Sequence, residues 1–248
     1  MKTVLTIAGS DPSGGAGLQR DLLTFHELGV CGLSVAAALT AQNSTDFKAA
    51  LPVPPRFVAR QADALLEEFE VNAVKIGMAG SPENLRAIRN LIKRRSLPNV
   101  VLDPVLRSTS GKSLLTKDGL SEIRSILASI HVVMPNLDEA AALTGVRRIN
   151  GVKEMELAAR RLFEMGARHA LVKGGHLEGE PVDVLFDGLS FRYYRGRRLK
   201  GGIGRFHGTG CILSAGIAAG LAKGKGVGEA VADARAYLVR VLRERPRA

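Results

Sequence analysis

Short apolar runs rich in β-branched residues recur along this chain and alternate with segments whose apolar residues have helical spacing. Several of these runs are apolar throughout, as expected of strands that are buried on both faces of a parallel sheet. The pattern therefore predicts an α/β fold, with a mainly parallel central sheet covered by helices on both faces. The expected strands cover residues 3–8, 32–39, 73–76, 100–102, 131–134 and 170–172.

The segments between these runs carry recognisable helix signals. An apolar stripe from Leu18 to Leu28 ends at Gly29, a suitable residue for the left-handed position after a helix. Ser81 followed by Pro82 has the pattern of an N-cap and a first-turn proline. Further helices are expected over residues 55–68, 117–129, 153–165, 209–222 and 228–243, and a hairpin over 182–186 and 191–194 around Asp187-Gly188.

Length and composition favour one domain over residues 1–248. A chain of 248 residues suits a single α/β domain, and 46% hydrophobic with 24% charged residues is close to the globular average. The first apolar segment is too short for a signal-peptide core or a membrane span, which favours a cytoplasmic protein without a membrane partner. In that reducing compartment Cys31 and Cys211 are expected to be free thiols.

The formal net charge of +11 would suit a nucleic-acid ligand. The basic residues are nevertheless spread over several separate stretches, and the chain has neither a zinc-finger spacing nor an aromatic stacking motif. We therefore expect no nucleic-acid partner, and we attribute the charge to a solvated surface that attracts anionic nucleotides. His26, His131, His169 and His176 show no metal-ligand spacing and are interpreted as structural.

Glycine and polar residues follow each expected strand. Ligands of open α/β sheets bind beyond the carboxyl ends of the strands, so these stretches should converge on one rim. The stretches are residues 9–17, 40–43, 77–78, 103–105, 135–136 and 173–176. The first of them has neither the GxGxxG order nor a final Gly-Lys-Ser/Thr, which excludes a dinucleotide fingerprint and a P-loop.

The turn Gly208-Thr209-Gly210-Cys211 opens an apolar helix of small residues. The unpaired amides of a first helical turn favour an anion, so a phosphate site is one interpretation; an ordinary tight turn before a buried helix is the other. Cys211 lies in that first turn, where the helix dipole is expected to lower the pKa of its thiol. It could then act as a base toward a substrate hydroxyl, or it could be an inert buried thiol.

Other strand-end residues have chemistry that suits a phosphorylated ligand. Asp103 and Glu139 could hold Mg²⁺ through waters, although Glu139 could equally offset a helix dipole. Lys173 could reach a phosphate or remain solvated. Gln42 offers the donor and acceptor that suit a nitrogen heterocycle, although a surface polar residue after a strand is the more common case. Asp21 faces either solvent or the site.

Seven stretches, taken together and in order, resemble the hydroxymethylpyrimidine and phosphomethylpyrimidine kinases of thiamine synthesis, a family of the ribokinase-like superfamily. They span nearly the whole chain, so the set is far more specific than any one motif. The stretches are residues 8–19, 38–43, 74–78, 102–105, 135–140, 172–176 and 207–211.

The resemblance implies a three-layer α/β/α fold, a homodimer, and the use of ATP and Mg²⁺. It also implies phosphorylation of 4-amino-5-hydroxymethyl-2-methylpyrimidine and then of its monophosphate. Around the pyrimidine the resemblance places Gly9, Ala16, Asp21, Gln42, Met78, Val105 and Cys211. For metal and phosphates it implies Asp103, Asn136 and Glu139, with Lys173 near the nucleotide and Gly208, Thr209, Gly210 and Cys211 as the anion hole.

Two stretches depart from the family pattern. Residues 200–206 are Lys-Gly-Gly-Ile-Gly-Arg-Phe where relatives are usually polar, and residues 108–111 are Ser-Thr-Ser-Gly where relatives commonly have a lysine. Our hypothesis is that Arg205 or Arg107 substitutes for the missing contacts. Two alternatives remain: a pyridoxal-type kinase, which handles a similar hydroxymethyl arm, and a non-catalytic pyrimidine sensor that has lost ATP use.

Overall fold

A computed structural model of the chain describes residues 1–43, 45–106, 117–198 and 206–244. Its strands form one sheet in the order β3-β2-β1-β4-β5-β6-β7-β8-β9. Their bounds are β1 Thr3–Ser10, β2 Cys31–Gln42, β3 Phe47–Pro52, β4 Ala73–Ile76, β5 Val100–Leu102, β6 Val132–Val133, β7 His169–Val172, β8 Val182–Phe186 and β9 Phe191–Arg195. The pairs from β2 through β1 and β4 to β7 are parallel, and β3, β8 and β9 add antiparallel edges.

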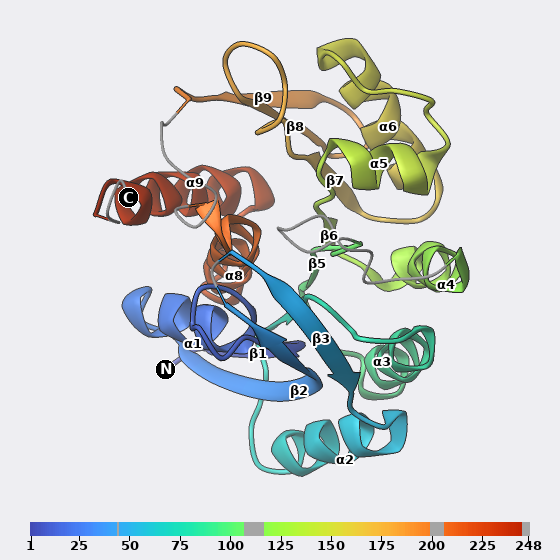
Figure 1. The fold of residues 1–248 in the computed structure, drawn as a ribbon, viewed down its shortest axis with the longest axis vertical. Coiled ribbons are helices and arrows are strands. Elements are labelled where there is room, and N and C mark those ends of the chain that lie inside the picture. Colours follow the sequence, from blue (N-terminus) through green and yellow to red (C-terminus); the bar gives the residue numbers. More distant parts are fainter. Residues whose placement is uncertain (44, 107–116, 199–205, 245–248) are drawn as a thin grey trace.

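Helices cover both faces of this sheet. Figure 1 shows α1, α8 and α9 on one side and α2 to α6 on the other. Their bounds are α1 Gly17–Glu27, α2 Pro55–Leu66, α3 Pro82–Arg95, α4 Lys117–Ile126, α5 Leu137–Thr144, α6 Val152–Glu164, α8 Thr209–Ala222 and α9 Val227–Glu244, with a 3-10 turn at Leu127–Ser129. The predicted three-layer α/β/α fold with a mainly parallel sheet is therefore confirmed.

Alternate residues of the central strands enter two different cores. In β1, Val4 packs in the core beneath α1, α8 and α9, whereas Leu5 and Ile7 pack in the core beneath α2 to α6. In β6, Val132 and Val133 divide between the two cores in the same way. Because successive side chains of a strand point to opposite faces, only an apolar run can serve both layers.

Most predicted boundaries agree with the structure within a few residues, and the caps agree in detail. Ser81 is the N-cap of α3, and its side chain accepts a hydrogen bond from the Asn84 amide at 3.1 Å. Gly29 follows the end of α1 with a φ of 66°, in the left-handed region that glycine favours.

Strand β3 was not predicted, and its presence corrects the end of β2. The carboxyl-terminal part of β2 pairs with β3 from Ala38 opposite Pro52 to Gln42 opposite Phe47, so β2 continues past residue 39. Gln42 is thus the last residue of a strand, and the prediction that it follows the strand was wrong. After Phe47 every residue of β3 is exposed, so this strand lacks the apolar pattern that revealed the others.

Candidate active site

The carboxyl ends of the parallel strands meet the first turn of α8. A Cβ atom added to Gly210 would lie 3.0 Å from Oδ2 of Asp103 and 3.5 Å from Nζ of Lys173. Residues that follow β5 and β7 therefore lie directly against the glycine turn. The polar ends of β5 and β7 thus converge at one rim, as expected.

The turn before α8 requires glycine for two reasons. Gly208 has a φ of 77°, and a Cβ atom there would overlap the carbonyl oxygen of Gly15. The helix begins at once, since the Ile212 amide donates to the Gly208 carbonyl at 3.0 Å. The amides of Thr209, Gly210 and Cys211 therefore have no acceptor within the helix, which is the arrangement that favours an anion.

Lys173 is held inside the site by Asp103. Its Nζ donates to Oδ1 of Asp103 at 2.6 Å, and only 16% of its side chain is exposed. Burial disfavours the ammonium, but the carboxylates of Asp103 and Glu139 more than offset it and raise the pKa of Lys173. The alternative of a solvated strand-end lysine was wrong, and a fixed positive charge stands beside the glycine turn.

Glu139 and Asn136 form the capping box of α5. The Asn136 side chain accepts from the Glu139 amide at 3.0 Å, and Oε2 of Glu139 accepts from the Asn136 amide at 2.8 Å. Burial raises the pKa of Glu139 to about 7, with the charge of Lys173 opposing the shift and that of Asp103 adding to it. Glu139 thus lies in the first turn of α5 as the acceptor of a capping box, and its role toward the metal or the helix dipole stays a prediction.

The donor set at this rim suits Mg²⁺ held mainly through waters and phosphates. Asp103 and Glu139 bring two carboxylates close enough to repel each other. Asp103 also accepts a hydrogen bond from Lys173, and Glu139 accepts one from the Asn136 amide. Neither carboxylate is therefore free to give all of its oxygen atoms to a metal ion. No group of three or more His, Cys, Asp or Glu residues in the described part of the chain is arranged around a metal position. Magnesium commonly needs only one or two carboxylates plus substrate phosphates.

The prediction that the helix dipole lowers the pKa of Cys211 was wrong. Burial raises the pKa of this thiol; Lys75 opposes the shift, whereas the carboxylates of Asp21 and Asp103 add to it. The nearby Gly17 amide also opposes the rise in the pKa of Cys211. At neutral pH the residue is therefore a thiol rather than a thiolate, because burial disfavours the charged form.

Asp21 lies inside the protein, paired with a lysine that the sequence analysis did not single out. Nζ of Lys75 donates to Oδ2 of Asp21 at 2.7 Å, Oγ1 of Thr6 donates to the same oxygen at 2.7 Å, and all three side chains are buried. The sequence did contain a signal for this pair, namely a lysine within the apolar strand β4. A charge on a strand that is covered on both faces needs a buried partner of opposite charge. Contact of Asp21 with a pyrimidine stays a prediction.

A second buried pair, Asp11 and His207, was also missed. Oδ2 of Asp11 lies 2.7 Å from Nε2 of His207 and accepts from the Ala16 amide at 2.8 Å. Burial opposes the Asp11 carboxylate, but the hydrogen bonds from His207, Ser13 and Ala16 lower its pKa overall. The pair joins the loop after β1 to the residue before the glycine turn.

The structure brings several of the proposed pyrimidine contacts together. A Cβ atom on Gly9 would lie 3.3 Å from the sulfur of Met78, and one on Gly17 would overlap the Gly9 carbonyl. Gly9, Met78 and the loop that includes Ala16 thus adjoin Cys211 through Gly17. Gln42 lies at the same edge, at the end of β2 and partly buried, and Val105 is also partly buried.

Apart from Phe206, the two stretches that depart from the family pattern lie outside the described residues. Arg107 and residues 108–111 fall between residues 106 and 117, and Arg205 falls between residues 198 and 206. The hypothesis that either arginine replaces a missing contact therefore stays a prediction.

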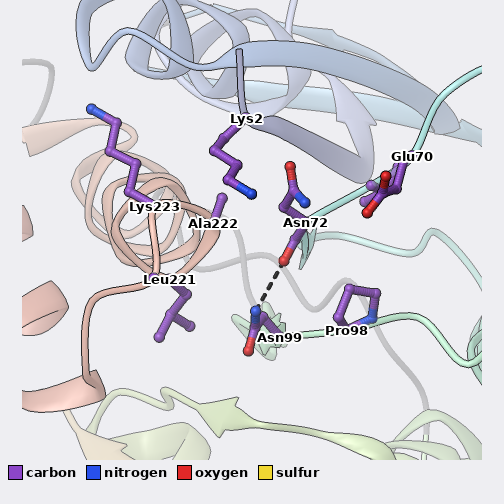
Figure 2. Close-up of a pocket in the computed structure, with 10 residues that line it drawn as sticks. Lys2, Glu70, Asn72, Pro98, Asn99, Leu221, Ala222 and Lys223 are labelled. Atoms are coloured by element: carbon purple, nitrogen blue, oxygen red, sulfur yellow. Dashed lines mark hydrogen bonds between the residues drawn. The ribbon is translucent and has the colours of Figure 1, made fainter.

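A shallow depression at the opposite end of the sheet is separate from this site. Figure 2 shows Lys2, Asn72 and Asn99 at its edge with Lys223, and the Asn99 side chain donates to the Asn72 carbonyl at 2.9 Å. These residues precede strands or follow α8, so they lie at the amino ends of the strands. Nδ1 of His131 lies 2.9 Å from Oδ1 of Asn99, in line with a structural histidine.

In the described part of the chain, a mainly parallel sheet lies between two layers of helices, and a glycine turn opens α8 at the carboxyl ends of the strands. This arrangement defines the class of ribokinase-like small-molecule kinases. Residues 11–248 match the family described as phosphomethylpyrimidine kinase. The chain belongs to this family, which confirms the resemblance. None of its helices in the described part is long and apolar enough to cross a membrane.

Relatives with assigned names agree with this placement. The chain is 45% identical to the hydroxymethylpyrimidine/phosphomethylpyrimidine kinase of Rhizobium meliloti, over 94% of this chain and 88% of that protein. It is 42% identical to the thiamine biosynthesis bifunctional protein ThiED of Geobacter sulfurreducens, over 97% of this chain and 49% of that protein. The chain thus spans about half the length of the Geobacter protein.

Solved structures show the same fold. A phosphomethylpyrimidine kinase from Clostridium difficile superposes with a TM-score of 0.86 at 35% identity, over 98% of this chain and all of that one. The pyridoxal kinase of Staphylococcus aureus in complex with AMP-PCP and pyridoxal also gives a TM-score of 0.86, at 31% identity over 96% of this chain and 87% of that one.

Proposed function

We propose that this protein transfers the γ-phosphoryl group of ATP to the hydroxymethyl oxygen of 4-amino-5-hydroxymethyl-2-methylpyrimidine, and then phosphorylates the resulting monophosphate. The observation that carries the proposal is the contact of the glycine turn with Asp103 and Lys173 on one side and with the loop of Gly9 and Ala16 on the other. A site for a transferring phosphate thereby adjoins the proposed pyrimidine contacts.

In the first step the hydroxymethyl oxygen forms a bond to the γ-phosphorus while the bond from that phosphorus to the β–γ bridging oxygen breaks, releasing ADP. The amides of Gly210 and Cys211, with the Lys173 ammonium, stabilise the charge on the transferring group. Mg²⁺, bound through phosphates and waters near Asp103 and Glu139, would supply further charge neutralisation. The hydroxyl proton passes to water or, at a pH high enough to populate the thiolate, to Cys211.

In the second step the nucleophile is an oxygen of the monophosphate, which carries no hydroxymethyl proton. The same turn and the same lysine would stabilise the second transfer. Because phosphoryl transfer has a loose transition state, positioning and charge stabilisation contribute more than a base. Cys211 is therefore a candidate base for the first step alone.

A mass-resolved assay tests this function directly. The purified protein is incubated with ATP and Mg²⁺ and with hydroxymethylpyrimidine, its monophosphate or pyridoxal. We expect the monophosphate and the diphosphate of the pyrimidine; absence of both would overturn the proposal.

A second candidate is a pyridoxal-type kinase, favoured by the similarity to the solved Staphylococcus aureus pyridoxal kinase. Pyridoxal phosphate as the main product of the same assay would select it. Pyrimidine binding without nucleotide binding, measured by calorimetry, would instead identify a non-catalytic sensor.

We further propose that the protein is cytoplasmic and homodimeric and that residues 1–248 form one domain.

A further inference from the structure

Two glycine-containing segments from opposite ends of the chain are packed together at the rim of the site. One is the loop of residues 9–17, which follows and partly overlaps the end of β1, and the other is the turn of residues 207–211, which opens α8. Gly208 and Gly15 approach so closely that a Cβ atom on Gly208 would overlap the Gly15 carbonyl. A Cβ atom on Gly15 would in turn overlap the His207 ring.

The side chains of Asp11 and His207 connect the two segments. Nε2 of His207 lies 2.7 Å from Oδ2 of Asp11, although the two residues are 196 positions apart. Both side chains are buried, at 0% and 7% exposure, so water competes little for this contact.

The Asp11 carboxylate also organises its own loop. Its Oδ1 accepts from the amide and the hydroxyl of Ser13, at 2.9 and 2.8 Å, and its Oδ2 accepts from the Ala16 amide at 2.8 Å. One carboxylate therefore fixes the loop internally and fixes it to His207. A loop rich in glycine loses much conformational entropy when it is ordered. The hydrogen bonds to Asp11 offset this cost.

The packed unit continues to the residues proposed to act on substrate. Gly17, the last residue of the loop, has a φ of 60° and lies against the Gly9 carbonyl. Its backbone amide is near enough to the Cys211 sulfur to favour the thiolate. Two contacts therefore join residues 9–17 to residues 207–211. One is between Asp11 and His207, and the other is between Gly17 and Cys211.

We propose that Asp11 and His207 are positioning residues, which hold the anion-binding turn of residues 207–211 in register with the substrate loop of residues 9–17. This inference rests on the proposed function, because it assigns one segment to the phosphate and the other to the pyrimidine. Neither residue contacts the reacting atoms. Their contact sets the distance between the acceptor hydroxyl and the transferring phosphate, on which the rate of an oriented reaction depends steeply.

Kinetics of four variants test the proposal. Asp11→Asn and His207→Ala are expected to lower kcat by about 10- to 100-fold, with KM for ATP and for the pyrimidine changed less than about threefold. His207→Gln, whose amide can still donate to Asp11, should recover part of kcat. The double variant Asp11→Asn/His207→Ala should be no slower than the worse single variant, because both changes break one contact. Additive losses, or an increase in KM alone, would overturn the proposal.

Asp63→Asn is the matched control. It removes one carboxylate that also pairs with basic side chains, Arg94 and Arg95 at 2.8 and 2.7 Å, but on α2 and α3, away from the glycine turn. We expect its kcat and KM to equal those of the unmodified protein. A comparable loss in this control would mean that the effect of Asp11→Asn is general rather than positional.

Hydrogen exchange of the backbone amides gives a second readout that needs no activity. In Asp11→Asn we expect faster exchange in residues 207–211 as well as in residues 9–17, and in His207→Ala the same two segments should respond. Faster exchange only in the segment that carries the substitution would refute the coupling. If the unmodified protein forms no pyrimidine phosphate, the proposed function fails, while the exchange experiment still decides whether the two segments are coupled.

Discussion

Lys75 lies on the central strand β4 and has no exposed surface, and Asp21 of α1 is its counter-ion. Burial raises the pKa of Asp21. Burial alone would lower the pKa of Lys75, but nearby negative groups, Asp21 first among them, raise it overall. Taking two charges out of water is costly, so the pair stabilises the fold only while both partners are present.

Removing one partner of this pair should therefore destabilise the protein strongly. We expect Lys75→Met to lower the free energy of unfolding by about 3–5 kcal/mol, since it leaves Asp21 buried without its counter-ion. The double variant Lys75→Met/Asp21→Asn should lose less free energy of unfolding than Lys75→Met alone. Denaturant unfolding monitored by circular dichroism measures both. A loss below about 1 kcal/mol for Lys75→Met would contradict a charged pair.

The raised pKa of Cys211 makes a pH prediction that separates the two phosphorylation steps. The base form is the thiolate, which becomes populated only as pH rises toward the raised pKa. If Cys211 accepts the hydroxyl proton, kcat of the first step should increase about tenfold per pH unit between pH 7 and 9. The second step should vary much less, because its nucleophile is a phosphate oxygen.

Cys211→Ser checks this assignment, since a serine hydroxyl does not ionise in this range. The variant should lose the pH dependence of the first step and keep that of the second. Rates are measured for each step separately over pH 6.5–9.5. An unchanged profile in the variant would show that water, and not Cys211, takes the proton.

At the scale of elements, helix α3 illustrates how a local signal becomes a tertiary contact. Ser81 caps the helix through the Asn84 amide, and the Asn84 side chain donates to the carbonyls of Ala37, Val53 and Ala79. The first turn of α3 thereby joins β2 and the segment before α2. None of these residues belongs to the proposed site.

Loss of this cap should affect stability without affecting catalysis. We expect Ser81→Ala to lower the free energy of unfolding by about 1 kcal/mol, because one first-turn amide loses its acceptor. Thermal or denaturant unfolding gives the stability, and kcat and KM should remain those of the unmodified protein. Ser81→Thr is the matched control and should retain most of the stability.

Elements with a strong local pattern were predicted well, and those decided by distant partners were not. The bounds of α8 agree with the prediction at both ends, because its small apolar residues are buried all round. Strand β3 escaped notice because it is an exposed edge whose strand form depends on pairing with β2. Strand β6 is only Val132–Val133, shorter than the predicted residues 131–134.

At the scale of the whole molecule, the β2–β3 ribbon presents an apolar surface. Leu39 and Leu51 are 51% and 67% exposed, and they are direct cross-strand partners. An edge strand with exposed leucines favours association with another chain. We expect this ribbon to take part in the proposed homodimer.

Light scattering coupled to size-exclusion chromatography tests this assembly. The unmodified protein should elute with twice the chain mass of 26.4 kDa, and Leu39→Ser/Leu51→Ser should shift the equilibrium toward monomer by at least tenfold in dissociation constant. Leu157→Ser, on the exposed surface of α6, is the matched control and should leave the mass unchanged. A double variant that stays fully dimeric would place the interface elsewhere.

The sequence alone determined the layered fold, two helix caps and the polar strand ends, because these follow from local patterns that the backbone must obey. It also indicated the kinase family, through the resemblance of seven ordered stretches to known kinases. Only the tertiary structure decided which of the buried charges belong together. Asp21 with Lys75, Asp103 with Lys173 and Asp11 with His207 are each pairs of residues far apart in the chain. Their pairing, like the raised pKa of Cys211, depends on burial and distance, which exist only once the chain has folded.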